Sequence, residues 1–240
     1  MAIKSYSYKT QKNVMCSPHT SVYEMASISS KGLYSDTVLV DTELMDMVEK
    51  LFSKLNCKKY LISSGYRTEV HDRAVGGNGK GYHTKGQAVD ACFYSKDGNI
   101  IPAKIVCCVA QDLGFGGIAN ISTNYRYVHL DVRKGKRYLG DEVKSMNTVT
   151  DNFYNYFGVT PQEVSKYTGE TISEYYPIYD GKSTKIDTVL KEIGVPASYI
   201  GSWSKRKPIA QKNGIGYYVG SASQNLKLLS LARQGKLRRV

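Results

Sequence analysis

This 240-residue chain lacks several features that would place it in a specialised class of protein. Its five cysteines are odd in number and form no C-x-x-C pair, which argues against a disulfide framework and against a cysteine-based zinc ribbon. No apolar run approaches the roughly 20 residues of a membrane-spanning helix, and the first residues contain no apolar signal-peptide core. We therefore expect a globular protein with buried thiols, without a membrane span, made in a reducing cytoplasm without a signal peptide.

Negative charge is scarce in the last quarter of the chain. The whole sequence has 33 Lys and Arg against 21 Asp and Glu, a formal net charge of +12. Residues 181–240 include twelve basic residues and only two acidic ones, Asp187 and Glu192, so this segment has a net charge of +10. Such a concentration of charge indicates an anionic partner, which is nucleic acid, a membrane surface or an acidic polymer.

Hydrophobic periodicity and turn residues predict an α+β first domain and a small, mostly helical C-terminal domain. We expect a first domain over 1–150, a closing segment and linker over 151–182, and a basic domain over 183–240. The elements predicted for the first domain are helices over 41–55 and 102–113, strands over 60–63, 88–94 and 125–133, and a long Gly-rich loop over 65–81. Those predicted for the last domain are short helices over 186–193, 207–212 and 223–233.

Histidine is also rare, and two of the four histidines stand near carboxylates. His83 precedes Asp90 by seven residues, and His129 lies two residues before Asp131 on a strand whose polar residues share one face. A catalytic zinc takes three protein ligands, typically His and Asp or Glu, and keeps a fourth position open. His83, Asp90 and His129 are therefore candidate zinc ligands, although a histidine beside a carboxylate is more commonly an ordinary hydrogen-bonded residue.

Four motifs follow one another between residues 64 and 132. They read Ser64-Gly65-Tyr66-Arg67-Thr68, then Val75-Gly76-Gly77, then His83-x-x-x-Gly86-x-Ala88-x-Asp90, and then Tyr127-Val128-His129-x-Asp131-Val132. Together they resemble the zinc D-Ala-D-Ala carboxypeptidase family, which includes D,D-dipeptidases and phage endolysins that cut L-Ala-D-Glu bonds. The resemblance covers residues from about 20 to 132.

The resemblance implies an antiparallel sheet flanked by helices, of the hedgehog/D,D-peptidase type, and a zinc peptidase acting on cell-wall peptides. The family's zinc ligands correspond to His83, Asp90 and His129, and its substrate-gripping arginine corresponds to Arg67. Zinc would polarise the scissile carbonyl and activate water, while Arg67 would bind a substrate carboxylate or the developing oxyanion. Tyr66 and Tyr127 are expected to contact the substrate as well.

The tail has a resemblance of its own. Residues from about 184 to 240, including Arg206-Lys207-Pro208-Ile209-Ala210 and Tyr218-Val219-Gly220-Ser221, resemble the C-terminal wall-binding segment of phage lysins that act on Gram-positive hosts. Such walls carry anionic polymers, which would explain the basic charge. Trp203, Lys205, Arg206 and Tyr218 are the expected wall-binding residues, and core packing is an equally good explanation for the aromatic ones.

The general base cannot be transferred from the family. Many members carry Glu three residues before the last zinc histidine, where this chain has Arg126, and an arginine side chain stays protonated. Asp131 shares a strand face with His129, so we expect it to act either as the base or as the residue that orients His129. A salt bridge from Asp131 to Arg133 or Lys85 is the competing explanation.

We therefore expect a peptidoglycan hydrolase of the endolysin type, made in the cytoplasm of a host cell and acting on its wall. It would hydrolyse a wall-peptide bond next to a D- or L-Ala residue. The alternatives are a catalytically inactive wall-binding or virion protein that keeps the fold, and a nucleic-acid-binding protein suggested by the pI of 9.3. No nucleic-acid-binding motif appears in the sequence, so we expect no nucleic-acid partner.

Overall fold

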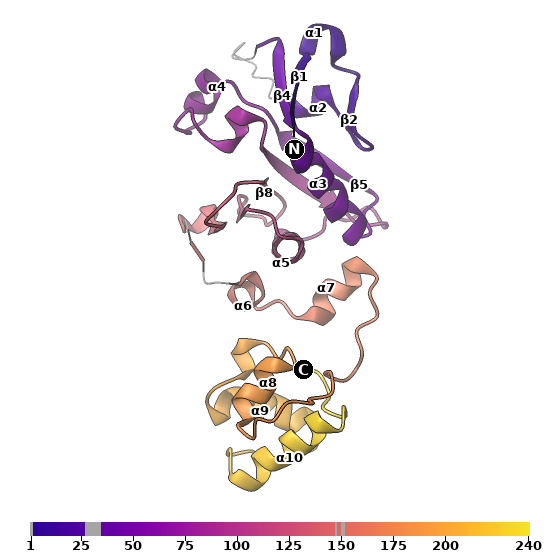
Figure 1. Cartoon of the computed structure of the whole chain (residues 1–240), viewed down its shortest axis with the longest axis vertical. Helices are drawn as coiled ribbons and strands as arrows, with labels where there is room; N and C mark the ends of the chain where they lie inside the picture. Colours follow the sequence, from indigo (N-terminus) through magenta and orange to yellow (C-terminus); the bar gives the residue numbers. More distant parts are fainter. Residues whose placement is uncertain (1, 27–34, 147, 150–151) are drawn as a thin grey trace. The chain divides into compact units, whose positions relative to one another are not determined.

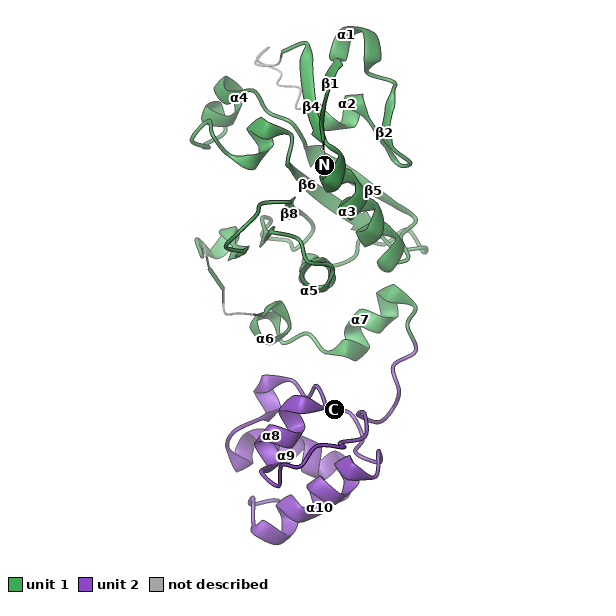
Figure 2. Ribbon diagram, viewed as in Figure 1, with its two compact units in different colours: residues 1–170 green, residues 171–240 purple. Residues whose placement is uncertain are grey.

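The chain divides into two compact units, Met1–Glu170 and Thr171–Val240 (Figure 1, Figure 2). The structure is a computed structural model that describes residues 2–26, 35–146, 148–149 and 152–240. The boundary between the units falls inside the segment 151–182, and the expected domain end at residue 150 lies outside the described residues. No helix in the described parts of the chain is long and apolar enough to cross a membrane.

The first unit is a mixture of short strands and helices. Its strands are β1 (Ile3–Ser7), β2 (Met15–Ser17), β3 (Thr20–Ser21), β4 (Thr37–Asp41), β5 (Lys59–Ser64), β6 (Ala88–Tyr94), β7 (Gly117–Asn120), β8 (Val128–Asp131) and β9 (Tyr138–Asp141). Its helices are α1 (Tyr8–Gln11), α2 (Val22–Met25), α3 (Thr42–Lys54), α4 (Glu69–Ala74), η1 (Tyr82–Lys85), α5 (Ala103–Leu113), η2 (Glu142–Lys144), α6 (Phe153–Phe157) and α7 (Pro161–Thr168).

The central sheet has five strands in the order β5-β6-β8-β7-β9. We expected an antiparallel sheet, but this sheet is mixed. The first four strands pair antiparallel, but β7 and β9 are parallel. The reason lies in the strand order. Both edges of β8 are already occupied by β6 and β7, so the chain leaving β8 passes to the far side of β7. There β9 runs opposite to β8 and therefore along β7.

The two faces of this sheet have different roles. On one face Val89, Phe93, Ile118, Val128 and Leu130 are fully buried and join the core that α3 and α5 cover. Asp41 caps α3 by accepting a hydrogen bond from Glu43 N, and Gly114 ends α5 in a left-handed conformation, as the sequence indicates. The opposite face carries the polar side chains of β6 and β8.

Two local predictions need correction. The Gly-rich stretch 65–81 is not all loop, because Thr68 caps α4 by accepting a hydrogen bond from His71 N. The strand expected over 125–133 is regular only over Val128–Asp131, since Tyr125 adopts a positive φ of 52° and closes a turn onto Ser122. All five cysteines are free, and four of them are buried.

The second unit is helical, as predicted. It contains α8 (Ile186–Glu192), η3 (Ala197–Tyr199), α9 (Trp203–Lys212) and α10 (Ala222–Arg233), and α8 packs against α10 around an apolar core of its own. Arg206 and Tyr218 belong to this interior. The Arg206 guanidinium donates to Tyr218 Oη (2.9 Å) and pairs with Asp187 (2.6 Å), and only 7% of Arg206 is exposed.

Candidate metal centre

Strand register brings the first two candidate ligands together. Asp90 on β6 lies directly opposite His129 on β8, so both side chains project from the same face of the sheet. The next pair along this face is Ala88 and Asp131, and β7 places Gly117 opposite Asp131. The sheet therefore presents a carboxylate, an imidazole and a second carboxylate on one face.

The third candidate ligand reaches this face from outside the sheet. His83 lies in η1, which ends at Gly86 with a φ of 69°, a conformation that favours glycine. The Arg67 backbone N–H donates to the His83 carbonyl (3.2 Å), and the His83 ring donates from Nδ1 to the Gly65 carbonyl (2.8 Å). These bonds turn Nε2 of His83 toward the sheet.

The three ligand atoms form a nearly equilateral triangle. His83 Nε2 lies 3.2 Å from His129 Nδ1 and 3.3 Å from Asp90 Oδ1, and His129 Nδ1 lies 3.0 Å from Asp90 Oδ1. Zinc bound tetrahedrally at about 2.0–2.1 Å would hold its ligands about 3.3 Å apart. Two imidazole nitrogens and one carboxylate oxygen at this spacing fit zinc, with one position left open.

Each histidine is oriented through its other ring nitrogen. His129 donates from Nε2 to Asp131 Oδ2 (3.1 Å), just as His83 donates from Nδ1 to the Gly65 carbonyl. Metal-binding histidines commonly have such a partner, because it fixes the ring and its tautomer. Asp131 is fully buried and lies on the side of the His129 ring that faces away from Asp90. It also pairs with Arg133, so the contact with His129 and the competing salt bridge exist together.

The electrostatics of the cluster favour a bound cation. Burial would raise the pKa of the Asp90 carboxyl, but hydrogen bonds with His129 and His83 outweigh it and hold that pKa well below its usual range. Burial also opposes ionisation of Asp131, yet bonds with His129 and Arg133 lower its pKa to about 2. Burial would lower the pKa of His129, whereas Asp131 and Asp90 raise it to about 9. Two ionised carboxylates therefore flank His129.

Arg67 lies behind the candidate metal ligand Asp90. Its guanidinium donates from Nη2 to Asp90 Oδ2 (2.8 Å) and from Nε to Ser64 Oγ (2.8 Å), and Nη1 lies 3.4 Å from Asp72 Oδ1. Asp72 is buried and also accepts a hydrogen bond from Gly79 N (2.9 Å). The Gly-rich loop is thereby tied to the cluster, and the second oxygen of Asp90 is neutralised.

An open hollow of about 440 Å³ adjoins this guanidinium. Arg67 and Ser64 line it on the side of the cluster, together with residues of α2, β5 and α4, including Glu24 and His71. Nδ1 of His71 is buried without a hydrogen-bond partner among the described residues. Tyr66 is half-buried against the core and Tyr127 is half-buried at the start of β8, and neither is among the residues that line the hollow.

Residues 19–131 match a family model described as peptidase M15. The first unit contains a peptidase M15 domain. Such peptidases are zinc-dependent metallopeptidases, and the matched stretch includes His83, Asp90, His129 and Asp131. It covers 131 − 19 + 1 = 113 residues and leaves the second unit outside. No curated protein matches the chain significantly.

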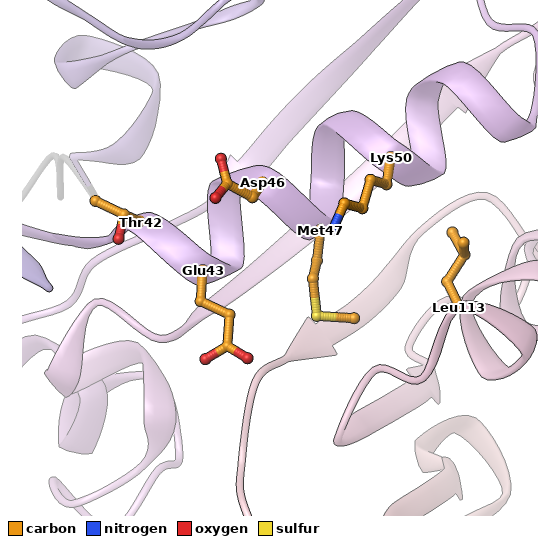
Figure 3. A pocket seen from close by; sticks show the side chains of 6 residues that line it. All are labelled: Thr42, Glu43, Asp46, Met47, Lys50 and Leu113. Carbon is orange, nitrogen blue, oxygen red and sulfur yellow. The ribbon is translucent and has the colours of Figure 1, made fainter. Parts of the chain in front are cut away.

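A second hollow of the peptidase unit lies away from these residues. In Figure 3 most of its lining side chains project from α3, and Leu113 stands apart from them at the end of α5. The hollow has a volume of about 300 Å³. No residue of the His83–Asp90–His129 cluster lines it. The lining residues are Thr42, Glu43, Asp46, Met47, Lys50 and Leu113.

Sequence patterns did not reveal two residues that support the peptidase centre. Gly117 leaves the space that Asp131 fills, because a Cβ on Gly117 would lie 2.1 Å from Asp131 Oδ2. Asp72 lies on α4 and pairs with Arg67. The Gly117–Asp131 contact joins two neighbouring strands, whereas the Asp72–Arg67 pair spans only five residues, and no local motif signals either contact.

Proposed function

We propose that this protein is a zinc peptidase of the endolysin type that hydrolyses a peptide bond of bacterial peptidoglycan next to a D- or L-Ala residue. The observation that carries the proposal is the His83–Asp90–His129 triangle, with ligand atoms 3.0 to 3.3 Å apart, inside a peptidase M15 domain. The motif resemblance to wall-peptide peptidases supplies the substrate class.

Zinc, when bound, supplies a Lewis acid that polarises the scissile carbonyl and makes water a better nucleophile near neutral pH. The chain's own residues supply the rest. Arg67 faces the hollow from beside the cluster, where its charge would hold a substrate carboxylate or stabilise negative charge that develops on the carbonyl oxygen. Asp131 is buried behind His129, and this favours the orienting role over that of a base.

The hollow beside Arg67 is the proposed substrate cleft. It is open to solvent and mixes apolar side chains such as Tyr23, Ile62 and Val75 with the polar groups of Glu24 and His71. A wall peptide likewise alternates small apolar and carboxylate-bearing groups. The Ser64 hydroxyl and the Arg67 guanidinium form the end of this cleft nearest to the metal ligands.

The second unit is proposed to anchor the enzyme to the wall. Over residues 171–240 it has twelve basic and four acidic residues, a net charge of 12 − 4 = +8, which suits an anionic polymer. Trp203 and Lys205 are exposed and remain candidate contact residues, and Tyr217 is 86% exposed. Arg206 and Tyr218 are buried and are better explained as residues that support the interior of this unit. We therefore do not propose them as wall contacts.

Digestion of purified Gram-positive peptidoglycan tests the function. We expect new amino termini at one type of bond, identified by mass spectrometry of the released fragments, with cleavage stopped by a chelator and restored by zinc. His83→Ala should abolish release, whereas His19→Ala should not, because His19 pairs with Glu49 outside the metal cluster. A zinc-loaded wild-type enzyme that releases no fragments would exclude the proposal.

A further inference from the structure

Arg133 occupies an unusual place behind the metal centre. It follows β8 by two residues, and its guanidinium carbon lies 4.6 Å from the ring centroid of Tyr82 and 4.7 Å from that of Tyr138. A guanidinium stacked on aromatic rings at such distances gains cation–π attraction and loses side-chain freedom. Arg133 is thus held by residues of two different elements, η1 and β9.

The same side chain also forms hydrogen bonds with the carboxylate of Asp131. Arg133 Nε lies 2.9 Å from Oδ1 and 3.0 Å from Oδ2, Nη2 donates to Oδ2, and the Arg133 backbone N–H donates to Oδ1 (3.0 Å). Asp131 Oδ2 in turn accepts the Nε2–H of His129 (3.1 Å). Because Asp131 is fully buried, these bonds decide where its carboxylate points.

We propose that Arg133 is a positioning residue for the metal centre and supports two of its ligands at once. One route runs through Asp131 to the ring of His129. The other runs through the stacked ring of Tyr82, which immediately precedes His83 in η1. The inference rests on the proposed zinc site, and it adds a residue that lies outside the matched stretch 19–131.

Both routes require the planar fork of arginine. A lysine ammonium is a single point of charge that cannot donate along both carboxylate oxygens while lying flat between two rings. Arg133→Lys would therefore keep the charge beside Asp131 and lose the geometry. Arg133→Ala would also leave the buried Asp131 carboxylate without its cation, which is costly for the fold.

Zinc affinity of the full chain, measured by competition with a chromophoric chelator, tests the inference. We expect Arg133→Ala and Arg133→Lys to weaken zinc binding by roughly 10–100-fold, the range seen when the partner of a metal-binding histidine is lost. Arg137→Ala is the matched control, because Arg137 is a neighbouring arginine that donates to the carbonyls of Phe115 (3.2 Å) and Gln111 (3.0 Å). It should bind zinc as the wild type does.

A second readout separates positioning from folding. In the metal-free protein, the Nε2–H proton of His129 should give a downfield NMR signal in the wild type and in Arg137→Ala. In Arg133→Lys this signal should be absent, while the melting temperature should stay close to that of the wild type. Unchanged zinc affinity in both Arg133 variants would overturn the inference, as would equal weakening in Arg137→Ala. A wild-type chain that binds no zinc would instead overturn the proposed function, and this inference with it.

Discussion

The buried carboxylate behind His129 can be displaced by a single methyl group. In Gly117→Ala the new Cβ would lie 2.1 Å from Oδ2, 2.4 Å from Cγ and 2.5 Å from Oδ1 of Asp131. No real Cβ tolerates such contacts, so the carboxylate must leave its place opposite Gly117. Asp131 is fully buried and also bonded to Arg133, so it cannot move far without breaking its bond to His129.

The expected cost has two parts. Overpacking of a filled interior destabilises a protein by about 1–3 kcal/mol. Loss of the partner of a metal-binding histidine weakens metal affinity by roughly 10–100-fold, or about 1.4–2.7 kcal/mol. We therefore expect Gly117→Ala to lower both the unfolding free energy of the metal-free protein and its zinc affinity, measured by chemical denaturation and by chelator competition.

Gly81→Ala is the control for this variant. The nearest atom that its Cβ would meet is Asp72 Oδ2 at 3.9 Å, an ordinary contact, and its φ of −65° suits any residue. It should change neither quantity measurably. If Gly117→Ala binds zinc within twofold of the wild type, then Asp131 does not control the His129 ring, and the reasoning about this face of the sheet is wrong.

Three other changes test the remaining assignments. Asp131→Asn should weaken zinc binding by roughly 10–100-fold if the carboxylate orients His129; a large loss of turnover with zinc retained would instead favour a base. Asp90→Ala should abolish zinc binding and hydrolysis while circular dichroism stays close to wild type, since the core on the opposite sheet face is apolar; retained hydrolysis would contradict the ligand assignment. Removal of residues 171–240 should reduce wall binding of the chain, and binding by the full chain should weaken with salt because exposed charges are screened over about 10 Å at 0.1 M; unchanged binding by the shortened chain would place the anchor elsewhere.

The residues of the His83–Asp90–His129 cluster could be predicted from the sequence. His83, Asp90 and His129 belong to motifs whose order is informative, and the alternation of the strand around His129 correctly placed Asp131 on the same face. The helix after Asp41 and the helix ending at Gly114 were also predictable, because capping residues and apolar spacing are local signals.

Only the tertiary structure shows how these residues are placed. The position of β9 beside β7 follows from β8 having both edges occupied, and it brings Tyr138 over Arg133. The same packing buries Asp131 behind His129, where sequence spacing allowed a base, an orienting group or a salt bridge. In the second unit, charge marked Arg206 as a surface residue, but its hydrogen bond to Tyr218 places it inside. Residue type and spacing determine which groups share a strand face, whereas only the packing of distant segments determines which of them meet solvent.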